Sequence, residues 1–303
     1  MINKINDKII IRFKFFLVFL FFNGIIIVKY KPKSALKVLI CTVAKQENKY
    51  IKEFVEHYEK LKFEKIIIYD NNDLNGENFN KILRNEIKNK FIEIIDYRGL
   101  SQPQESALND CYNKNKMNYD WIAFYDIDEF LYIRKYSDIN QFLSLGKFKK
   151  CQSIIINWKY FGDNDKLYYE SKPLSKRFIY PLDIAKINID YKHLFFSAAK
   201  TIVRGRLNIT WGHLPHYINN TKNCRPSGKI LKNYFSPPQL SKAWLSHYIT
   251  KSTEEFIQRL KRGDVLLKPN LHYIKNRIDN YYFAFNKFTV EKSELFKKKL
   301  NLS

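Results

Sequence analysis

Apolar runs and amphipathic stretches alternate along the first half of the chain. Four short apolar runs predict buried strands, and between them apolar residues recur at the spacing of amphipathic helices. The predicted strands are 35–43, 65–69, 91–95 and 121–125, and the predicted helices are 51–61, 79–87 and 103–119. This alternation is typical of an α/β protein with an open, mostly parallel sheet flanked by helices.

Polar side chains follow each predicted strand at its carboxyl end. The four groups are Thr42 to Glu47, Asp70 to Asp73, Asp96 to Arg98 and Asp126 to Glu129. Because ligands of open parallel sheets bind at the carboxyl edge of the strands, we expect these groups to form one site. The chain contains neither GxGxxG nor GxxxxGK[ST], so Rossmann dinucleotide binding and P-loop hydrolysis lose support.

The last of these groups is the most acidic. Asp126 and Asp128 are two residues apart, so in an extended chain both side chains point to the same side. Two carboxylates at a strand end suit a divalent cation that also binds phosphates. An alternative is an acidic turn in which Asp128 or Glu129 caps a following helix.

The second half of the chain gives weaker signals. Strands are predicted at Ser153 to Trp158 and Ser197 to Val203, and the stretch between them is aromatic, basic and irregular. Ser252 and Glu255 are three residues apart at the start of an amphipathic stretch, which predicts a helix that begins with a capping box.

Charge and cysteine usage narrow the function classes. The 303 residues carry a formal net charge of +23, which favours anionic partners such as nucleotide-sugars or an acidic membrane surface. The basic residues are spread along the chain without a nucleic-acid-binding module, so we expect no nucleic acid partner. The four cysteines have no CxxC spacing, and we expect them to be buried free thiols in a reducing compartment.

Both ends of the chain differ from its middle. Residues 15–28 are strongly apolar and have Lys and Arg on both sides, so we interpret 1–34 as a membrane anchor or interfacial segment with a linker rather than a core helix. Residues 266–303 are expected to be a basic helical tail that contacts anionic lipid or solvent. We expect the domain between them, 35–265, to be membrane-associated on the cytoplasmic side, or lumenal as in the Golgi if the source is a eukaryote.

Several of these segments together resemble a glycosyltransferase. The segments that carry the resemblance are 42–48 (TVAKQEN), 51–58 (IKEFVEHY), 68–73 (IYDNND), 110–112 (DCY), 121–131 (WIAFYDIDEFL), 157–162 (NWKYFG), 247–256 (HYITKSTEEF) and 262–263 (RG). They are similar to the nucleotide-binding half of the GT-A fold, and more narrowly to glycosyltransferase family 92 (DUF23) and family-2-like enzymes. The resemblance covers about residues 36–265.

The resemblance implies transfer of a sugar from a nucleotide-diphosphate donor, a UDP-sugar, to a hydroxyl of a glycan or glycolipid acceptor, with inversion. Thr42 to Glu47 would line the nucleoside pocket, with backbone groups of Val43 and Ala44 near the base. Asp70 and Asn71 would contact base or ribose. Asp126 and Asp128 would be the DxD pair that binds ribose and Mn²⁺ or Mg²⁺, and His247 would supply a metal or phosphate contact from the C-terminal part. His213 and His216 remain alternatives to His247.

Departure of the nucleoside diphosphate requires positive charge, and an inverting transfer requires a base. The candidate cations are Arg98, Arg225 and Lys251, each of which has a surface charge as its alternative interpretation. Asp163, which follows the NWKYFG segment, is the predicted base. Its competitors are Asp165, Glu170 and Glu129.

Two other functions compete with glycosyl transfer. A nucleotidyl- or phosphoryl-transfer enzyme with two metals would need more carboxylates at the site. A catalytically inactive, membrane-associated carbohydrate-binding protein would show neither turnover nor metal-dependent nucleotide binding. The intact Asp126–Ile127–Asp128 sequence and the polar strand ends favour the transferase.

Overall fold

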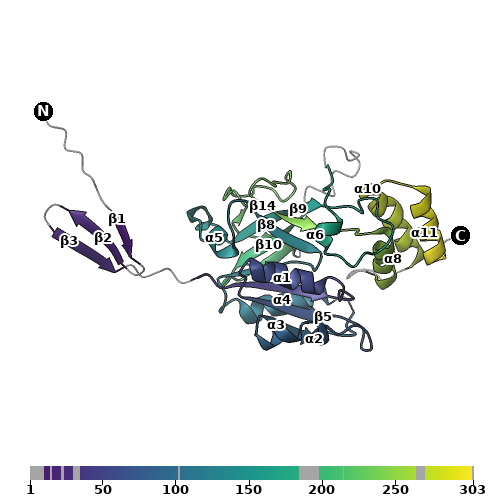
Figure 1. Cartoon of the computed structure of the whole chain (residues 1–303), viewed down its shortest axis with the longest axis horizontal. Helices are drawn as coiled ribbons and strands as arrows, with labels where there is room; N and C mark the ends of the chain where they lie inside the picture. The colour runs from purple at the N-terminus through teal and green to yellow at the C-terminus, as the bar shows by residue number, and fades with distance from the viewer. Residues whose placement is uncertain are drawn as a thin grey trace. The chain divides into compact units, whose positions relative to one another are not determined.

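The structure is a computed structural model that describes residues 10–13, 16–21, 24–29, 35–101, 103–183, 198–213, 215–263 and 270–301. Figure 1 shows the chain coloured from purple at the N-terminus to yellow at the C-terminus. It divides into two compact units, Met1–Ala35 and Leu36–Ser303, which are described separately below.

The described residues of the first unit form three short strands. They are β1 (Ile10–Phe13), β2 (Phe16–Phe21) and β3 (Gly24–Lys29), and they form an antiparallel sheet in the order β1-β2-β3. In the part of the chain that the structure describes, no helix has the length and apolar character needed to cross a bilayer. The membrane anchor in residues 1–34 stays a prediction.

The second unit is built on one large sheet. Its main path has the order β6-β5-β4-β7-β10-β9-β14-β8, and β13 pairs with β9 beside it. The strands are β4 (Val38–Ala44), β5 (Lys65–Asp70), β6 (Ile92–Asp96), β7 (Trp121–Phe124), β8 (Glu129–Ile133), β9 (Ser153–Tyr160), β10 (Ala199–Arg204), β13 (Asn223–Cys224) and β14 (Ala243–His247). A separate hairpin consists of β11 (Thr210–His213) and β12 (Tyr217–Asn219).

The helices follow the strands of the first half and then cluster at the C-terminus (Figure 1). They are α1 (Ile51–Lys60), α2 (Phe79–Ile82), α3 (Arg84–Lys88), α4 (Gln104–Asn115), α5 (Ile139–Leu143), the 3₁₀ turn η1 (Gly146–Phe148), α6 (Leu174–Arg177), α8 (Thr253–Arg262), α9 (Leu271–Arg277), the π-helical segment η4 (Ile278–Tyr282), α10 (Phe283–Phe285) and α11 (Val290–Leu300).

The parallel part of the sheet is buried on both faces. Along β4, Val38 and Ile40 belong to the core cluster that contains α1, whereas Leu39 and Cys41 belong to the cluster that contains α4. Successive strand residues point to opposite faces, so helices on both sides require a continuous apolar run. The α/β class with a mostly parallel sheet is confirmed, with strands β4, β5, β6 and β7 at the predicted positions.

Antiparallel pairing extends this sheet in the second half. Strand β10 lies antiparallel between β7 and β9, and β14 runs parallel to β9 and antiparallel to β8. In the last pairing His247 lies opposite Glu129, so the end of β14 lies beside the acidic segment. The capping box predicted from Ser252 and Glu255 begins α8, which follows β14 directly. Residues of α9, η4 and α11 pack against α8 in a core cluster of their own.

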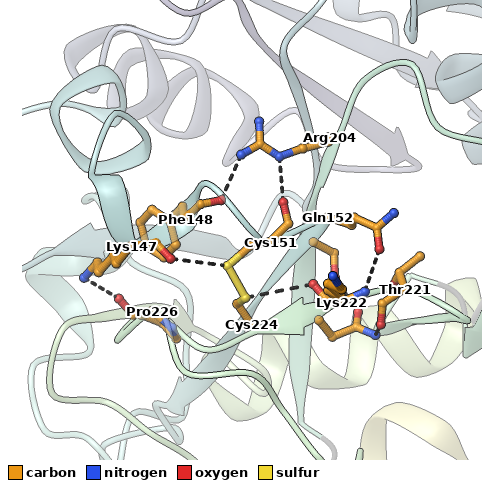
Figure 2. The surroundings of a disulfide bond; sticks show 11 residues. Lys147, Phe148, Cys151, Gln152, Arg204, Thr221, Lys222, Cys224 and Pro226 are labelled. Atoms are coloured by element: carbon orange, nitrogen blue, oxygen red, sulfur yellow. Dashed lines mark hydrogen bonds between the residues drawn. A yellow bond between two sulfur atoms is a disulfide. The ribbon is translucent and has the colours of Figure 1, made fainter.

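The cysteines form two disulfides, so the prediction of free thiols was wrong. Cys41 on β4 is bonded to Cys111 on α4, and Cys151 before β9 is bonded to Cys224 on β13. The Cα–Cα distances of 6.2 and 5.7 Å suit disulfide bonds. The bonded residues are 70 and 73 positions apart, a separation that leaves no local spacing signal. Figure 2 shows the second disulfide, where Arg204 donates hydrogen bonds to the carbonyls of Cys151 and Phe148.

Candidate active site

The acidic segment after β7 is a tight, internally bonded turn. The Glu129 N–H donates to the Asp126 carbonyl at 3.1 Å, and Glu129 Oε2 accepts from the Asp126 N–H at 3.0 Å. Glu129 is fully buried, and burial raises the pKa of its carboxyl group well above the ordinary value. The turn leads into strand β8, so the alternative in which Asp128 or Glu129 caps a helix was wrong.

Asp126 is held through one oxygen by a buried lysine. Lys200 Nζ, on β10, lies 2.7 Å from Asp126 Oδ2 and 3.7 Å from Glu129 Oε1. Burial alone would lower the pKa of Lys200, but Asp126 and Glu129 raise it, so the ammonium stays charged. The Lys200 side chain is 1% exposed and that of Asp126 is 41% exposed. Asp126 therefore combines a fixed position with access to solvent.

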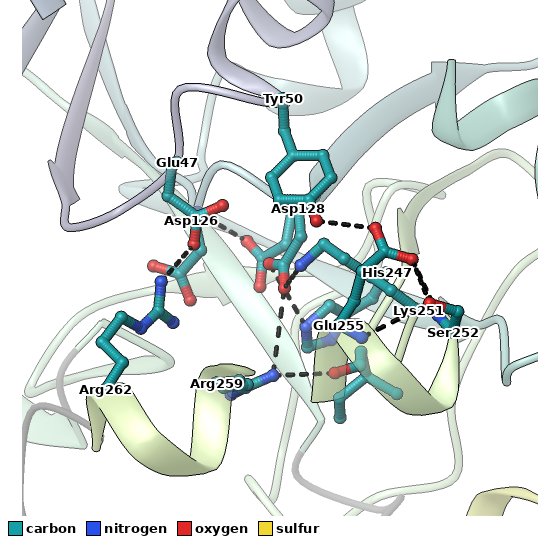
Figure 3. Close-up of polar contacts among 12 residues, drawn as sticks. Glu47, Tyr50, Asp126, Asp128, His247, Lys251, Ser252, Glu255, Arg259 and Arg262 are labelled. Carbon is teal, nitrogen blue, oxygen red and sulfur yellow. Dashed lines mark hydrogen bonds and ion pairs between the residues drawn. The ribbon is translucent and has the colours of Figure 1, made fainter. Parts of the chain in front are cut away.

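Asp128 uses its two oxygens differently (Figure 3). Oδ2 lies 3.2 Å from Lys251 Nζ and 4.0 Å from Arg259 Nη1, whereas Oδ1 lies 3.5 Å from His247 Nε2. Burial disfavours the charged carboxylate, but the cations Lys251 and Arg259 outweigh it and hold its pKa below the ordinary value. Asp128 is therefore an ionised carboxylate in a nearly closed site.

His247 and Asp128 fit a divalent cation. Burial lowers the pKa of His247 to about 4, so at neutral pH its imidazole is uncharged, which is the form that binds metals. A carboxylate oxygen and an imidazole nitrogen 3.5 Å apart can both ligate one ion at bond lengths of about 2.1 Å. Among the described residues no group of three or more His, Cys, Asp and Glu side chains could hold a metal, so other ligands would come from phosphates and water.

A pocket of about 480 Å³ lies beside Asp128 on the Lys251 and Arg259 side. Such a volume is in the range of small-molecule sites. The residues that line it are Gln46, Glu47, Lys49 and Tyr50 after β4, Gly76 and Glu77 after β5, and Thr250, Lys251, Glu255, Gln258, Arg259, Lys261 and Arg262 in and before α8. Arg262 Nη1 lies 2.7 Å from Glu47 Oε1 and connects α8 to the loop after β4.

A buried network fixes the start of α8 (Figure 3). Glu255 accepts hydrogen bonds from Tyr50 Oη at 2.6 Å and from Arg177 Nη1 and Nη2 at 2.7 and 2.8 Å. It also accepts from the backbone N–H and the hydroxyl of Ser252 at 3.0 and 2.6 Å. The preceding residue, Lys251, has a left-handed backbone with φ of 57°, and its Nζ lies 4.7 Å from the centre of the Tyr50 ring. The network therefore holds Lys251 in a conformation that few lysines adopt.

The structure brings five of the predicted site residues together. Asp126, Asp128 and His247 meet at the acidic turn, and Glu47 and Lys251 line the adjacent pocket.

The other residues predicted to contact the nucleotide, on β4 and at the end of β5, do not line the pocket. Thr42 and Ala44 are buried and Val43 is half-buried on β4, and none of the three lines the pocket. Asp70 Oδ1 accepts from the Asn72 N–H at 3.0 Å, and burial raises the pKa of Asp70. Asn71 donates to the carbonyls of Tyr97 and Leu100. These polar groups are largely occupied with backbone groups of the loops.

Asp163 does not have the setting of a catalytic base. Its side chain is 3% exposed, and Oδ2 lies 2.7 Å from Lys292 Nζ and 2.5 Å from Tyr282 Oη. It therefore connects the turn after β9 to the C-terminal helices, because a buried carboxylate needs charged and hydrogen-bonding partners. The role of Asp163 as catalytic base stays a prediction that this setting does not support.

Two predicted cations also lie outside the pocket. Arg98 makes a two-point contact with Asp96, Nε to Oδ1 at 3.0 Å and Nη2 to Oδ2 at 2.9 Å. Arg225 donates to the Pro237 carbonyl at 2.9 Å and borders a different, much smaller cavity. Neither lines the pocket beside Asp128, so neither assignment is supported.

Sequence reasoning missed several residues of the site. Glu255, Arg259 and Arg262 are spaced i, i+4 and i+7, which places them on one face of the predicted helix, and this signal was available. Lys200 interrupts an apolar strand, where a buried charge requires a partner. No sequence pattern indicated a role for Arg177, because its partner Glu255 is 78 positions away in the chain.

Comparison with known proteins places the chain in a family. The profile of glycosyltransferase family 92 matches residues 37–281. The chain belongs to glycosyltransferase family 92. Relatives include family 92 proteins of Ricinus communis, 25% identical over 97 residues, and of Arabidopsis thaliana, 28% identical over 107 residues. These alignments cover 32% and 34% of this chain but only 17% and 18% of the relatives. The family predicted from the sequence is confirmed.

Two solved structures show a distant likeness to this family 92 chain. One is S. aureus TarS 1–349 in complex with UDP, with a TM-score of 0.41 and 12% identity over 88% of this chain and 79% of that one. Another is the mannosyltransferase PcManGT from Pyrobaculum calidifontis in complex with GDP-Man and Mn²⁺, with a TM-score of 0.33 and 10% identity over 41% of this chain and 36% of that one.

Proposed function

We propose that this family 92 chain transfers a sugar from a nucleoside-diphosphate donor, a UDP-sugar, to a hydroxyl of a glycan or glycolipid acceptor. The observation that carries the proposal is the position of Asp128. One of its oxygens lies beside neutral His247 and the other faces the cations of a pocket large enough for a nucleotide. A Mn²⁺ or Mg²⁺ ion on Asp128 and His247 would supply Lewis acidity to the donor diphosphate.

The residues of the chain supply positioning and charge. Lys251 and Arg259 fix Asp128 Oδ2, so Oδ1 keeps its orientation toward His247. The same two side chains line the pocket together with Lys49, Lys261 and Arg262, and these cations favour a diphosphate. Charge that develops on a leaving phosphate is best stabilised by groups that are already in place, and the bonded start of α8 provides such groups.

Inversion at the transferred carbon is part of the proposal through the family resemblance. No base is assigned, because Asp163 is occupied by Lys292 and Tyr282. The anomeric configuration of the product, read by NMR during turnover, tests this part alone.

The two rival functions have less support. A two-metal phosphoryl-transfer site needs more convergent metal-binding side chains than occur among the described residues. A decayed binding protein does not explain why Asp126 and Asp128 are each held by a lysine in a fixed position.

Calorimetric titration of UDP into the full chain, with and without Mn²⁺, tests the donor site. We expect micromolar binding that requires Mn²⁺ and is lost in an Asp126→Ala/Asp128→Ala variant. The matched control, Glu56→Ala/Glu59→Ala, removes two exposed carboxylates from α1 and should bind UDP normally. A folded wild type that binds none of UDP, GDP, CDP and dTDP would refute the proposal.

We also propose that the catalytic unit lies in an oxidising compartment, with residues 1–34 associated with a membrane. The two disulfides support the oxidising compartment, because such bonds form and persist mainly outside the cytosol. Alkylation of the cellular protein before and after reduction should reveal four thiols only after reduction. Four thiols that react without reduction would place the catalytic unit in a reducing compartment.

A further inference from the structure

Trp158 lies near both of the paired aspartates of the site, Asp126 with Lys200 and Asp128 with His247. It comes from β9, and its ring centre is 4.5 Å from the ring centre of His247, the partner of Asp128. Nζ of Lys200, the partner of Asp126, lies 5.8 Å from the same ring. Trp158 as a residue is half-buried, and its Nε1 is buried. It is the aromatic side chain that connects both pairs, and the proposed function gives it no role so far.

The indole N–H of Trp158 differs from those of Trp211 and Trp244. It is buried and has no hydrogen-bond partner among the described residues. In contrast, Trp211 Nε1 donates to Asn109 at 2.7 Å and Trp244 Nε1 donates to Ser246 at 3.2 Å. A buried donor without an acceptor is costly and calls for an explanation. The neighbouring ring nitrogen His247 Nδ1 also has no partner in the described chain.

A sugar ring can supply hydrogen-bond partners for the Trp158 N–H and for His247 Nδ1, and it can also pack on the indole. The CH groups on a pyranose face pack on aromatic rings, and its hydroxyls both accept and donate hydrogen bonds. With Nε2 of His247 directed at Asp128 and available for the metal, Nδ1 carries the proton, so sugar hydroxyl oxygens can accept from both the Trp158 N–H and the His247 Nδ1–H.

The position of Trp158 indicates which part of the donor it meets. The cationic pocket lies on the Oδ2 side of Asp128 with Lys251 and Arg259, whereas His247 lies on the Oδ1 side. Trp158 contacts His247 and does not line the pocket. With the nucleotide in the pocket and the diphosphate near Asp128, the next group of the donor reaches the indole.

We propose that Trp158 is the platform of the donor-sugar subsite, on which the transferred pyranose stacks. This inference rests on the proposed function, because it takes the pocket beside Asp128 to hold the nucleoside diphosphate. The subsite binds sugar and not nucleotide, so Trp158 contributes to the affinity for UDP-sugars and contributes nothing to the affinity for UDP.

The test compares UDP with UDP-glucose, UDP-galactose and UDP-GlcNAc by calorimetry on the full chain with Mn²⁺. For the UDP-sugar that wild type binds best, Trp158→Leu should raise Kd about tenfold, because it removes both the stacking and the N–H. Kd for UDP should stay within twofold. Trp158→Phe keeps a ring without the N–H and should raise Kd for the UDP-sugar about threefold, which also tests the inference if the Leu variant does not fold.

Trp244→Leu is the matched control. Trp244 lies on β14, where its ring stacks on Tyr132 at 5.8 Å, and its N–H is already bonded. Both Kd values should stay within twofold in this variant. Equal weakening of UDP and UDP-sugar in the Trp158 variants, or no change in either, would overturn the inference while the donor site stands. No binding of any nucleotide to wild type would overturn the proposed function, and the inference with it.

Discussion

The Glu255–Arg177 ion pair is expected to contribute strongly to stability. Both side chains are 1% exposed, and the guanidinium makes two hydrogen bonds to the carboxylate. Removal of one partner from a buried pair costs about 3–5 kcal/mol, because the other charge stays buried without compensation. In Arg177→Met the carboxylate still accepts from Tyr50 and Ser252, so we expect a loss of about 3 kcal/mol, at the lower end of that range.

The lowered pKa of Glu255 corresponds to a similar magnitude for its whole set of partners. Burial raises its pKa, but hydrogen bonds from Arg177, Ser252 and Tyr50 outweigh burial and lower the pKa from 4.5 to about 2. At about 1.4 kcal/mol per pH unit, this difference also corresponds to about 3 kcal/mol. Because the folded-state pKa is lowered, the stabilisation is complete above pH 4.5 and is lost as the pH falls toward 2.

Urea unfolding followed by near-UV circular dichroism at pH 7 and pH 3 measures this contribution. We expect the difference between wild type and Arg177→Met to be large at pH 7 and clearly smaller at pH 3. The control Arg98→Met removes an arginine with an equally close two-point contact, but on the surface, and should cause no measurable change. A difference below about 1 kcal/mol at pH 7, or one that does not depend on pH, would refute the reasoning.

Three other variants test separate parts of the molecule. Asp163→Asn should lower stability by about 3 kcal/mol, because it leaves buried Lys292 without its closest partner, and should leave UDP affinity unchanged in calorimetry. Loss of turnover with unchanged stability would instead restore Asp163 as the base. Cys41→Ala/Cys111→Ala should cost about 4 kcal/mol in urea unfolding, as expected for a closed loop of 70 residues. His247→Gln should abolish the Mn²⁺-dependent part of UDP binding, and unchanged Mn²⁺ dependence would remove His247 from the metal site.

The parallel half of the fold was predictable because its signals are local. Each strand from β4 to β7 is a short apolar run that ends in polar residues, and β4, β5 and β6 are each followed by a stretch of helical periodicity. The carboxyl edge of a parallel sheet then places Asp126 and Asp128 at a site without knowledge of the rest of the fold. His247 and Lys251 were predicted as site residues, and both lie in the segment 247–256 that resembles the family.

The second half was not predictable because its contacts join distant positions. Strand β14 pairs with β8 more than a hundred residues earlier, and this register brings His247 opposite Glu129. Asp163 was assigned from its place after NWKYFG, but its partners Lys292 and Tyr282 lie in the C-terminal helices, 129 and 119 positions away in the chain. The prediction of free cysteines was wrong for the same reason, because a separation of 70 residues in the sequence carries no information about distance in space.

Fixed cations explain how three acidic groups can lie close together at the site. Asp126, Asp128 and Glu129 have Lys200, Lys251 and Arg259 within 4.0 Å, so fixed cations match the carboxyl groups before any ligand binds. Without Lys200 and Lys251 the carboxylates would repel one another and rotate, and no oxygen would keep a defined position. Because each lysine bonds to only one oxygen of its aspartate, the second oxygen keeps its capacity to accept. In the proposed function, a divalent cation and a diphosphate would enter together with little change in net charge, so we expect the donor to bind with its metal rather than the metal alone.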